Sequence, residues 1–174
     1  TWMLRPSAEG VTIVQHGGTW SGQHSGFVMV PERNFAMTVL TNSQGGAELS
    51  NELFADDWAL RIFAGVSNLP ASPEHLSAED LKPYEGRYVA EQIAVSGSHE
   101  KVILDFGAGD GQLDGTMSSE GIDNERVGLA FYRTDYGLNL GPDNKPTGTR
   151  ANFVRGADGA IAWFRSHGRL YRRQ

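Results

Sequence analysis

The chain has 174 residues, and its 15 Lys and Arg against 21 Asp and Glu give a net charge of -6 at pH 7. That balance disfavours binding to the phosphate backbone of a nucleic acid. Hydrophobic residues at 39% and charged residues at 21% are typical of a globular chain, and no apolar run approaches the ~20 residues of a membrane span. The absence of cysteine excludes disulfides and leaves the compartment open, bacterial periplasmic or secreted and cytoplasmic being equally compatible.

The first third of the chain predicts three strands. The apolar runs that indicate them lie at 11–15 and in two stretches of 27–42, which are joined by a polar turn that Pro31 opens. The first run leads into His16, Gly17 and Gly18. A strand end that carries an imidazole and then two residues without side chains lets a ligand lie directly against backbone N–H groups. This point is therefore the candidate active site.

Residues 46–64 predict a helix that is apolar on two sides. Two stripes recur at helical spacing on roughly opposite faces: Leu49, Leu53, Leu60 and Phe63, and Phe54, Trp58 and Ile62. Gly65 is suited to the position just beyond the helix end. We expect one stripe to pack on the three strands and the other to meet either the downstream domain or polypeptide absent from this chain.

The His16-Gly17-Gly18 element, the closing hairpin and the helix after it resemble the C-terminal portion of the penicillin-recognising serine hydrolases. This group contains class C β-lactamases, D-aminopeptidases and esterases. The resemblance implies that residues 1–65 form the C-terminal part of a β-lactamase-like hydrolase domain, with three strands of an antiparallel sheet and a terminal helix. The His-Gly-Gly element would then be the third motif of that active site.

The same resemblance implies roles for individual residues. His16, Gly18 and Thr19 would be catalytic, with the Thr19 backbone N–H helping to hold the oxyanion of an acyl-enzyme reaction. Substrate would be bound by the residues around them: Gly17, Trp20, His24 and Ser25. Because the usual lysine and threonine are absent here, the resemblance favours a small-molecule ester or peptide substrate over a β-lactam. The alternative for His16 is a strand-end histidine that bonds to a neighbouring loop.

The nucleophile of that family, the serine of a Ser-x-x-Lys motif, has no counterpart before His16. Residues 98–101 spell Ser-His-Glu-Lys, but their surroundings predict a hairpin loop, whereas the motif needs a helix start. The sequence therefore predicts an inactive fragment of a hydrolase. Because units below ~70 to 80 residues rarely bury enough apolar surface, its first part would need the missing N-terminal portion of the domain, a second copy of the chain or the domain that follows.

Beyond a linker rich in Pro and Ser at 66–80, a second domain is expected over 81–174. Its eight or so short apolar stretches between turn signals predict a small antiparallel barrel or sandwich, which makes the overall fold class α+β. The stretch 81–88 resembles the opening of the lipocalin-like domain often fused behind these hydrolases. The alternative function is a non-catalytic ligand-binding or interaction module built on that barrel.

Neither a metal nor a cofactor is expected. Three carboxylates lie among glycines at 105–115, but Asp-Gly is a preferred turn dipeptide and the spacing does not fit a calcium loop. The five histidines include no pair at i, i+4 on a predicted helix, so they do not indicate a zinc site.

Overall fold

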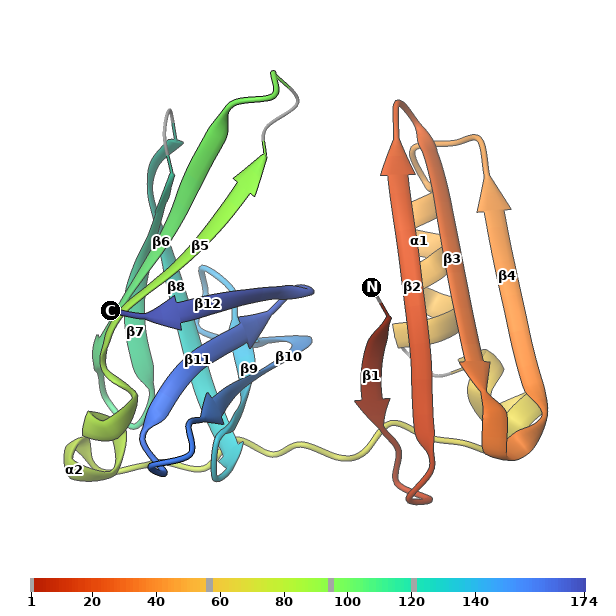
Figure 1. Cartoon of the computed structure of the whole chain (residues 1–174). Coiled ribbons are helices and arrows are strands. Elements are labelled where there is room, and N and C mark those ends of the chain that lie inside the picture. Colours follow the sequence, from red (N-terminus) through yellow and green to blue (C-terminus); the bar gives the residue numbers. More distant parts are fainter. Residues whose placement is uncertain (1, 56–57, 94–95, 120–121) are drawn as a thin grey trace. The chain divides into compact units, whose positions relative to one another are not determined.

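A computed structural model of the chain describes residues 2–55, 58–93, 96–119 and 122–174 (Figure 1). It divides into two compact units, residues 1–70 and 71–174. Each unit has a hydrophobic core of its own. The two units are therefore described separately.

The first unit is built on an antiparallel sheet of four strands in chain order (Figure 1): β1 (Met3–Pro6), β2 (Thr12–Trp20), β3 (Gln23–Val30) and β4 (Phe35–Thr41). Strands β2 and β3 form a hairpin closed by Ser21 and Gly22, both at positive φ (44° and 80°). A short 3-10 turn, η1 (Pro31–Arg33), leads into β4 through Asn34 in the left-handed region. Gly22 and Asn34 are residue types that tolerate such backbone angles.

Helical segments cover one face of this sheet. They are α1 (Gly46–Ser50) and two segments with π-type hydrogen bonding, η2 (Asn51–Ala55) and η3 (Leu60–Ala64). Gly65 ends the last segment at φ 61°, where a residue without a Cβ is favoured. The core of the unit lies between sheet and helix and contains Ile13, Val28, Val30, Phe54, Leu60 and Val66.

Gly26 allows the helical segments to approach β3 closely. A Cβ added at Gly26 would lie 2.5 Å from Cε2 of Phe54 and 3.2 Å from Oγ of Ser50. Side-chain carbon atoms do not approach so closely without displacing one another. The packing of Phe54 on the sheet therefore depends on a glycine at this position.

The second unit is a closed antiparallel barrel of eight strands, in the order β10-β11-β12-β5-β6-β7-β8-β9. It is preceded by α2 (Ala78–Leu81), which the Ser77 side chain caps at Asp80 N, and by η4 (Lys82–Tyr84). The strands, also seen in Figure 1, are β5 (Gly86–Ile93), β6 (His99–Ala108), β7 (Leu113–Ser119), β8 (Ile122–Arg133), β9 (Tyr136–Leu140), β10 (Pro146–Arg155), β11 (Ile161–Ser166) and β12 (Arg169–Arg173).

The fold class predicted from the sequence is wrong. Its small barrel is compatible with the second unit, but the chain is mostly β, and the first unit is a four-stranded sheet instead of three strands with a terminal helix of a hydrolase domain. Strand β1 escaped the prediction because it is four residues long and ends at a proline, which the pattern of apolar runs cannot distinguish from a loop. The predicted helix over 46–64 is divided among α1, η2 and η3 in the described residues.

We expect Gly26→Ala to destabilise the first unit by roughly 1–3 kcal/mol, because the new methyl group must displace Phe54. Gly45→Ala is the matched control, since a Cβ there meets only Ser43 Oγ, at 3.8 Å. Urea unfolding followed by tryptophan fluorescence measures both variants. Equal midpoints for the two would show that the close approach at Gly26 carries no energetic weight.

Candidate functional site

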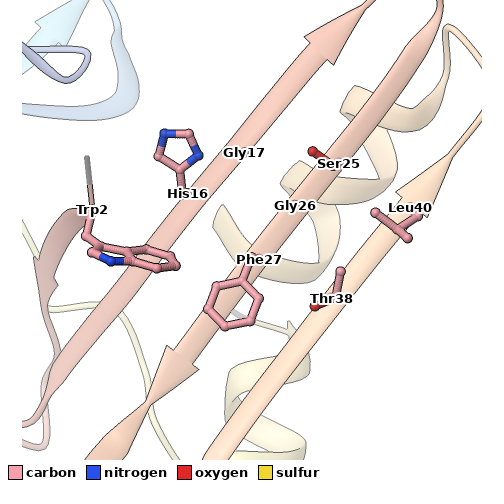
Figure 2. Close-up of a pocket in the computed structure, with 8 residues that line it drawn as sticks. All are labelled: Trp2, His16, Gly17, Ser25, Gly26, Phe27, Thr38 and Leu40. Carbon is pink, nitrogen blue, oxygen red and sulfur yellow. The ribbon is translucent and has the colours of Figure 1, made fainter.

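The sheet of the first unit has one covered and one open face. Val28 and Val30 of β3 point to the helical segments and are fully buried. Because side chains alternate along a strand, Ser25 and Phe27 lie on the opposite face. Figure 2 shows that open face in front, with the helical ribbon behind the strands.

A groove of about 430 Å³ lies on the open face (Figure 2). Its lining comes from β2, β3, β4 and the residue before β1: Trp2, His16, Gly17, Ser25, Gly26, Phe27, Thr38 and Leu40. Trp2 lies edge-on to the His16 ring at 6.3 Å between centroids and contacts the Phe27 ring at 5.4 Å. The groove thus combines an aromatic wall with an imidazole and a glycine backbone.

The structure brings only some of the predicted site residues together. His16, Gly17 and Ser25 line the groove, and Gly18 lies opposite Ser25 in the ladder. Trp20 is 72% exposed, beyond the groove at the hairpin end.

Two predicted residues lie on the other face. The side chains of Thr19 and His24 are cross-strand partners, with Oγ1 and Nδ1 3.0 Å apart. They alternate with Gly18 and Ser25, so they point toward the helical side, where Cβ of His24 comes within 3.0 Å of the Cβ position of Gly46. The His24 imidazole therefore does not reach the groove.

Five groove residues were not singled out from the sequence: Trp2, Gly26, Phe27, Thr38 and Leu40. Phe27 pairs directly with His16, and Thr38 pairs with Phe27 on the next strand. Strand register was the signal that could have found them, because cross-strand partners share a face. Using this signal requires the exact residues of the two turns, which the sequence locates only approximately.

Strand β2 has an unpaired edge beside the groove. Its pairing with β1 covers Thr12 to Gln15 and stops there, whereas its pairing with β3 continues to Trp20. Residues 16–20 of β2 therefore have, within the described chain, a strand partner on one side only. An edge of this kind can accept another extended segment.

The hydrogen-bond alternation identifies which groups this edge offers. In an antiparallel ladder a residue directs both its N–H and its C=O to one neighbour, and the next residue directs them to the other. The two-residue turn makes Trp20 and Gln23 a hydrogen-bonded pair, so Gly18 and His16 also face β3. The backbone groups of Gly17 and Thr19 consequently face the open edge.

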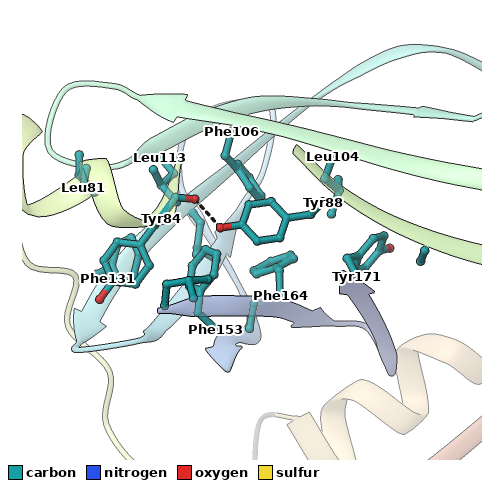
Figure 3. Packing of buried hydrophobic residues seen from close by; sticks show 14 of the residues in the cluster. Leu81, Tyr84, Tyr88, Leu104, Phe106, Leu113, Phe131, Phe153, Phe164 and Tyr171 are labelled. Atoms are coloured by element: carbon teal, nitrogen blue, oxygen red, sulfur yellow. Dashed lines mark hydrogen bonds between the residues drawn. The ribbon is translucent and has the colours of Figure 1, made fainter. Parts of the chain in front are cut away.

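The barrel interior of the second unit is filled with side chains (Figure 3). Phe153 lies near its centre, with ring centroids 4.8 Å from Tyr84, 5.9 Å from Phe131 and 4.9 Å from Phe164. Tyr88 is fully buried, and its hydroxyl donates to the Tyr84 carbonyl at 2.7 Å. Burial raises the pKa of Tyr88 to about 12. This aromatic packing is that of a core rather than of a ligand cavity.

A polar network joins Tyr84, Asp135 and Arg155 in the second unit. Arg155 makes a two-pronged ion pair with Asp135, at 2.7 and 2.8 Å, and the Tyr84 hydroxyl donates to the same carboxylate at 2.9 Å. These contacts, led by the Arg155 hydrogen bonds, lower the pKa of Asp135. A smaller recess of about 270 Å³ lies beside Tyr84, between residues 74–80 and 131–134.

The other sequence motifs lie in a loop and a turn of the second unit. Ser98 lies in the loop between β5 and β6, and residues 109–112 form the turn between β6 and β7. In the part of the chain that is described, no three His, Asp or Glu side chains gather in a way that could hold a metal ion. Among the same residues no helix has the length and apolar character that crossing a membrane requires.

Comparison with known proteins gives a likeness in fold. No protein-family model matches the chain, and no curated protein matches it in sequence. A crystal structure of SurE is 20% identical with a TM-score of 0.56, covering 99% of this chain and 36% of the SurE chain. A crystal structure of SurE with D-Leu is 21% identical with a TM-score of 0.55, covering 99% and 38%. The chain thus spans less than two fifths of the SurE chains.

These findings correct the family assignment made from the sequence. They return SurE, and nothing in them points to a penicillin-recognising serine hydrolase. The acyl-enzyme function and the β-lactamase, esterase and D-aminopeptidase activities drawn from that resemblance are withdrawn with it. A histidine followed by two glycines before a hairpin describes a strand with an accessible backbone, and this pattern is too short to specify one chemistry.

The alternative function, a ligand-binding module built on the barrel, is corrected as well. Only its barrel architecture agrees with the structure, because the interior holds the side chains of Tyr88, Phe106, Phe153 and Phe164.

We expect Phe153→Ala to lower the free energy of unfolding by about 3–5 kcal/mol, since it removes the ring that contacts most of the barrel core. Ile93→Ala, at a side chain that is 70% exposed, is the control and should change it by less than about 1 kcal/mol. Chemical denaturation followed by near-ultraviolet circular dichroism distinguishes them. A small effect at Phe153 would mean that the barrel is loosely packed.

Asp135 should make the stability of the chain depend on pH. Because the folded-state pKa of its carboxyl is lowered, the stabilisation is present above the ordinary carboxyl pKa and is lost as the pH falls through the folded-state value. Asp135→Asn should therefore be less stable than the wild type at pH 7, and the difference should shrink toward zero in acid. The asparagine remains compatible with φ 65° at this position.

Urea unfolding at a series of pH values measures this difference. Asp143→Asn is the control, because the Asp143 and Lys145 side chains are 61% and 80% exposed and their ion pair contributes little. A wild-type minus Asp135→Asn difference that stays constant down to strongly acid pH would contradict the assignment.

Proposed function

We propose that the groove on the open face of the first unit binds a small amino acid or peptide-like molecule through the unpaired edge of β2. The observation that carries the proposal is the position of that edge: the backbone groups of Gly17 and Thr19 face outward beside the groove that His16 and Ser25 line. Backbone pairing recognises the amide or carboxyl groups of a ligand, and the adjoining groove accepts its side chain.

The lining supports a ligand with one apolar group. Trp2, Phe27 and Leu40 supply apolar surface, and the rings of Trp2 and Phe27 lie within contact distance of each other. His16 and Ser25 add hydrogen-bonding side chains to the same groove. Sites for small molecules commonly combine such apolar walls with a few polar groups. The SurE structure with D-Leu supports a branched apolar amino acid as the first ligand to test.

In this proposal the predicted site residues are binding residues. Gly17 and Thr19 contribute backbone groups, and Gly18 keeps side-chain atoms away from the strand. His16 and Ser25 contact the ligand. Trp20 lies beyond the groove, and His24 contacts the Thr19 hydroxyl on the covered face, with Nδ1 and Oγ1 3.0 Å apart. Esters and peptides are further ligands to test, because both carry the carbonyl group that the edge would receive.

Thr19 offers the most specific test, because its N–H faces the open edge of β2 whereas its hydroxyl contacts His24. Thr19→Pro removes the N–H that faces the open edge, and proline is tolerated where an edge N–H has no strand partner. We expect it to weaken D-leucine binding by roughly tenfold or more. Thr19→Val removes only the hydroxyl contact with His24 and should bind within about twofold of the wild type.

Isothermal titration with D-leucine and L-leucine, and nuclear magnetic resonance of the His16 ring, measure this binding. Equal affinities of the proline and valine variants would show that the edge N–H takes no part. The absence of wild-type binding up to the solubility limit would overturn the proposed ligand class.

A further inference from the structure

The recess beside Tyr84 lies wholly within the second unit, at the end of the barrel where Figure 1 shows α2. It measures about 270 Å³ and is bounded by residues 74–80 and by residues 131–134 at the end of β8. Because the strands of this unit form a closed barrel, the recess does not depend on a free sheet edge. Mouths of β-barrels are common places for sites that bind small molecules.

The inner wall of the recess is apolar. It consists of Leu76, Tyr84 and Phe131, all of which pack in the barrel core. The rings of Tyr84 and Phe131 are buried, with centroids 4.6 Å apart (Figure 3). The Tyr84 hydroxyl donates to Asp135 at 2.9 Å, which fixes the ring. A methylene chain that lies against this wall gains contact with apolar surface.

Two carboxylates line the recess on the side of residues 74–80. The Glu74 N–H donates to the Phe131 carbonyl at 2.7 Å, which holds residue 74 against β8. Its exposed side chain forms neither a hydrogen bond nor an ion pair within the described residues. The Ser77 hydroxyl donates to Oδ2 of Asp80 at 2.6 Å and accepts from the Asp80 N–H, so the Asp80 side chain is held in place with Oδ1 available.

A guanidinium lines the recess on the side of β8. Arg133 lies over the ring of Tyr136, with Cζ 3.8 Å from the ring centroid. Such stacking orients a guanidinium and leaves its N–H groups available to a carboxylate. Among the residues that the structure describes, Arg133 forms an ion pair with neither Glu74 nor Asp80, although all three line the recess. A ligand that carries both charges can bridge side chains that do not meet directly.

We propose that this recess binds an ω-amino acid, a chain of methylene groups with an ammonium at one end and a carboxylate at the other. The ammonium meets Glu74 and Asp80. The carboxylate accepts hydrogen bonds from Arg133 and from the Thr134 hydroxyl, and the methylene chain lies on the apolar wall.

The charges of the lining favour this class over simpler ligands. A monoamine leaves Arg133 without a partner, and a monocarboxylate brings a third negative charge to Glu74 and Asp80. An α-amino acid carries both charges on one carbon atom, which is too close a spacing for side chains that are not themselves in ion-pair contact. The inference does not rest on the function proposed for the groove of the first unit.

Titration of the whole chain with 6-aminohexanoate, followed by nuclear magnetic resonance, measures this binding. We expect saturable shifts of the Leu76 and Phe131 amide signals, which weaken at high salt because the charged side chains are exposed. Hexylamine and hexanoate each carry only one of the two charges and should bind at least about threefold more weakly. L-Leucine should shift these two signals no more strongly than hexanoate does.

Two substitutions with matched controls locate the site. Glu74→Gln should weaken binding of 6-aminohexanoate about three- to tenfold, whereas Glu79→Gln, at an exposed carboxylate of α2 outside the recess, should leave it unchanged. Arg133→Gln should weaken it to a similar degree. Arg172→Gln is its control, because Arg172 is exposed and also lies over an aromatic ring, that of Trp163. All four side chains are exposed, so the variants should keep the wild-type circular dichroism.

A wild-type chain without saturable shifts at Leu76 and Phe131 overturns the proposal. So does hexylamine that binds as tightly as 6-aminohexanoate, which would make the recess a site for cations alone. Equal losses in Glu74→Gln and Glu79→Gln would mean attraction by net charge and would exclude a specific site. Thr19→Pro, in the first unit, should leave this titration unchanged, so the two proposed sites can fail separately.

Discussion

The packing of helical side chains against β3 is the contact on which the first unit depends. Phe54 and Leu60 bury Val28 and Val30, and the missing side chain at Gly26 lets them do so. Once these side chains point to the helical side, the alternation of side chains along a strand determines the face of the residues between them. Ser25 and Phe27 must face outward, and their partners across the ladder must follow.

This one constraint therefore positions a polar site through apolar contacts. His16 faces the groove because its cross-strand partner is Phe27 rather than Val28. A slip of one residue between β2 and β3 would turn His16 toward the helix and bring Thr19 to the open face. The type of turn at Ser21 and Gly22 and the burial of Val28 work together against such a slip.

Sequence patterns found the parts of this unit that depend on local chemistry. The runs before His16 and on both sides of Pro31 are strands, and Gly65 ends the helical region. The sequence did not show on which face of the sheet each side chain lies. His24 and Thr19 were grouped with His16 because they are close along the chain, although the pleat directs them to the other side of the sheet. Trp2 was missed because β1 is too short to show a period.

In the second unit, turn signals indicated a small barrel, but they carry no information about what fills it. Alternating apolar residues line a barrel in the same way whether the interior is a cavity or a core. The size of the residues decides between them, and here Tyr88, Phe106, Phe153 and Phe164 converge on the same volume. The family resemblance failed for a related reason, since three residues at a strand end identify an accessible backbone and not the chemistry performed there.

The shortness of β1 has a consequence for access to the β2 edge. In the register of Met3 with Gln15, an extension of β1 by a few residues would run along Gly17 and Thr19 and take up their outward N–H and C=O groups. How far a strand pairs along this side of β2 thus decides whether the edge is open or occupied. Any segment that is tethered near Met3 and can adopt an extended conformation would compete with a free ligand at high effective concentration.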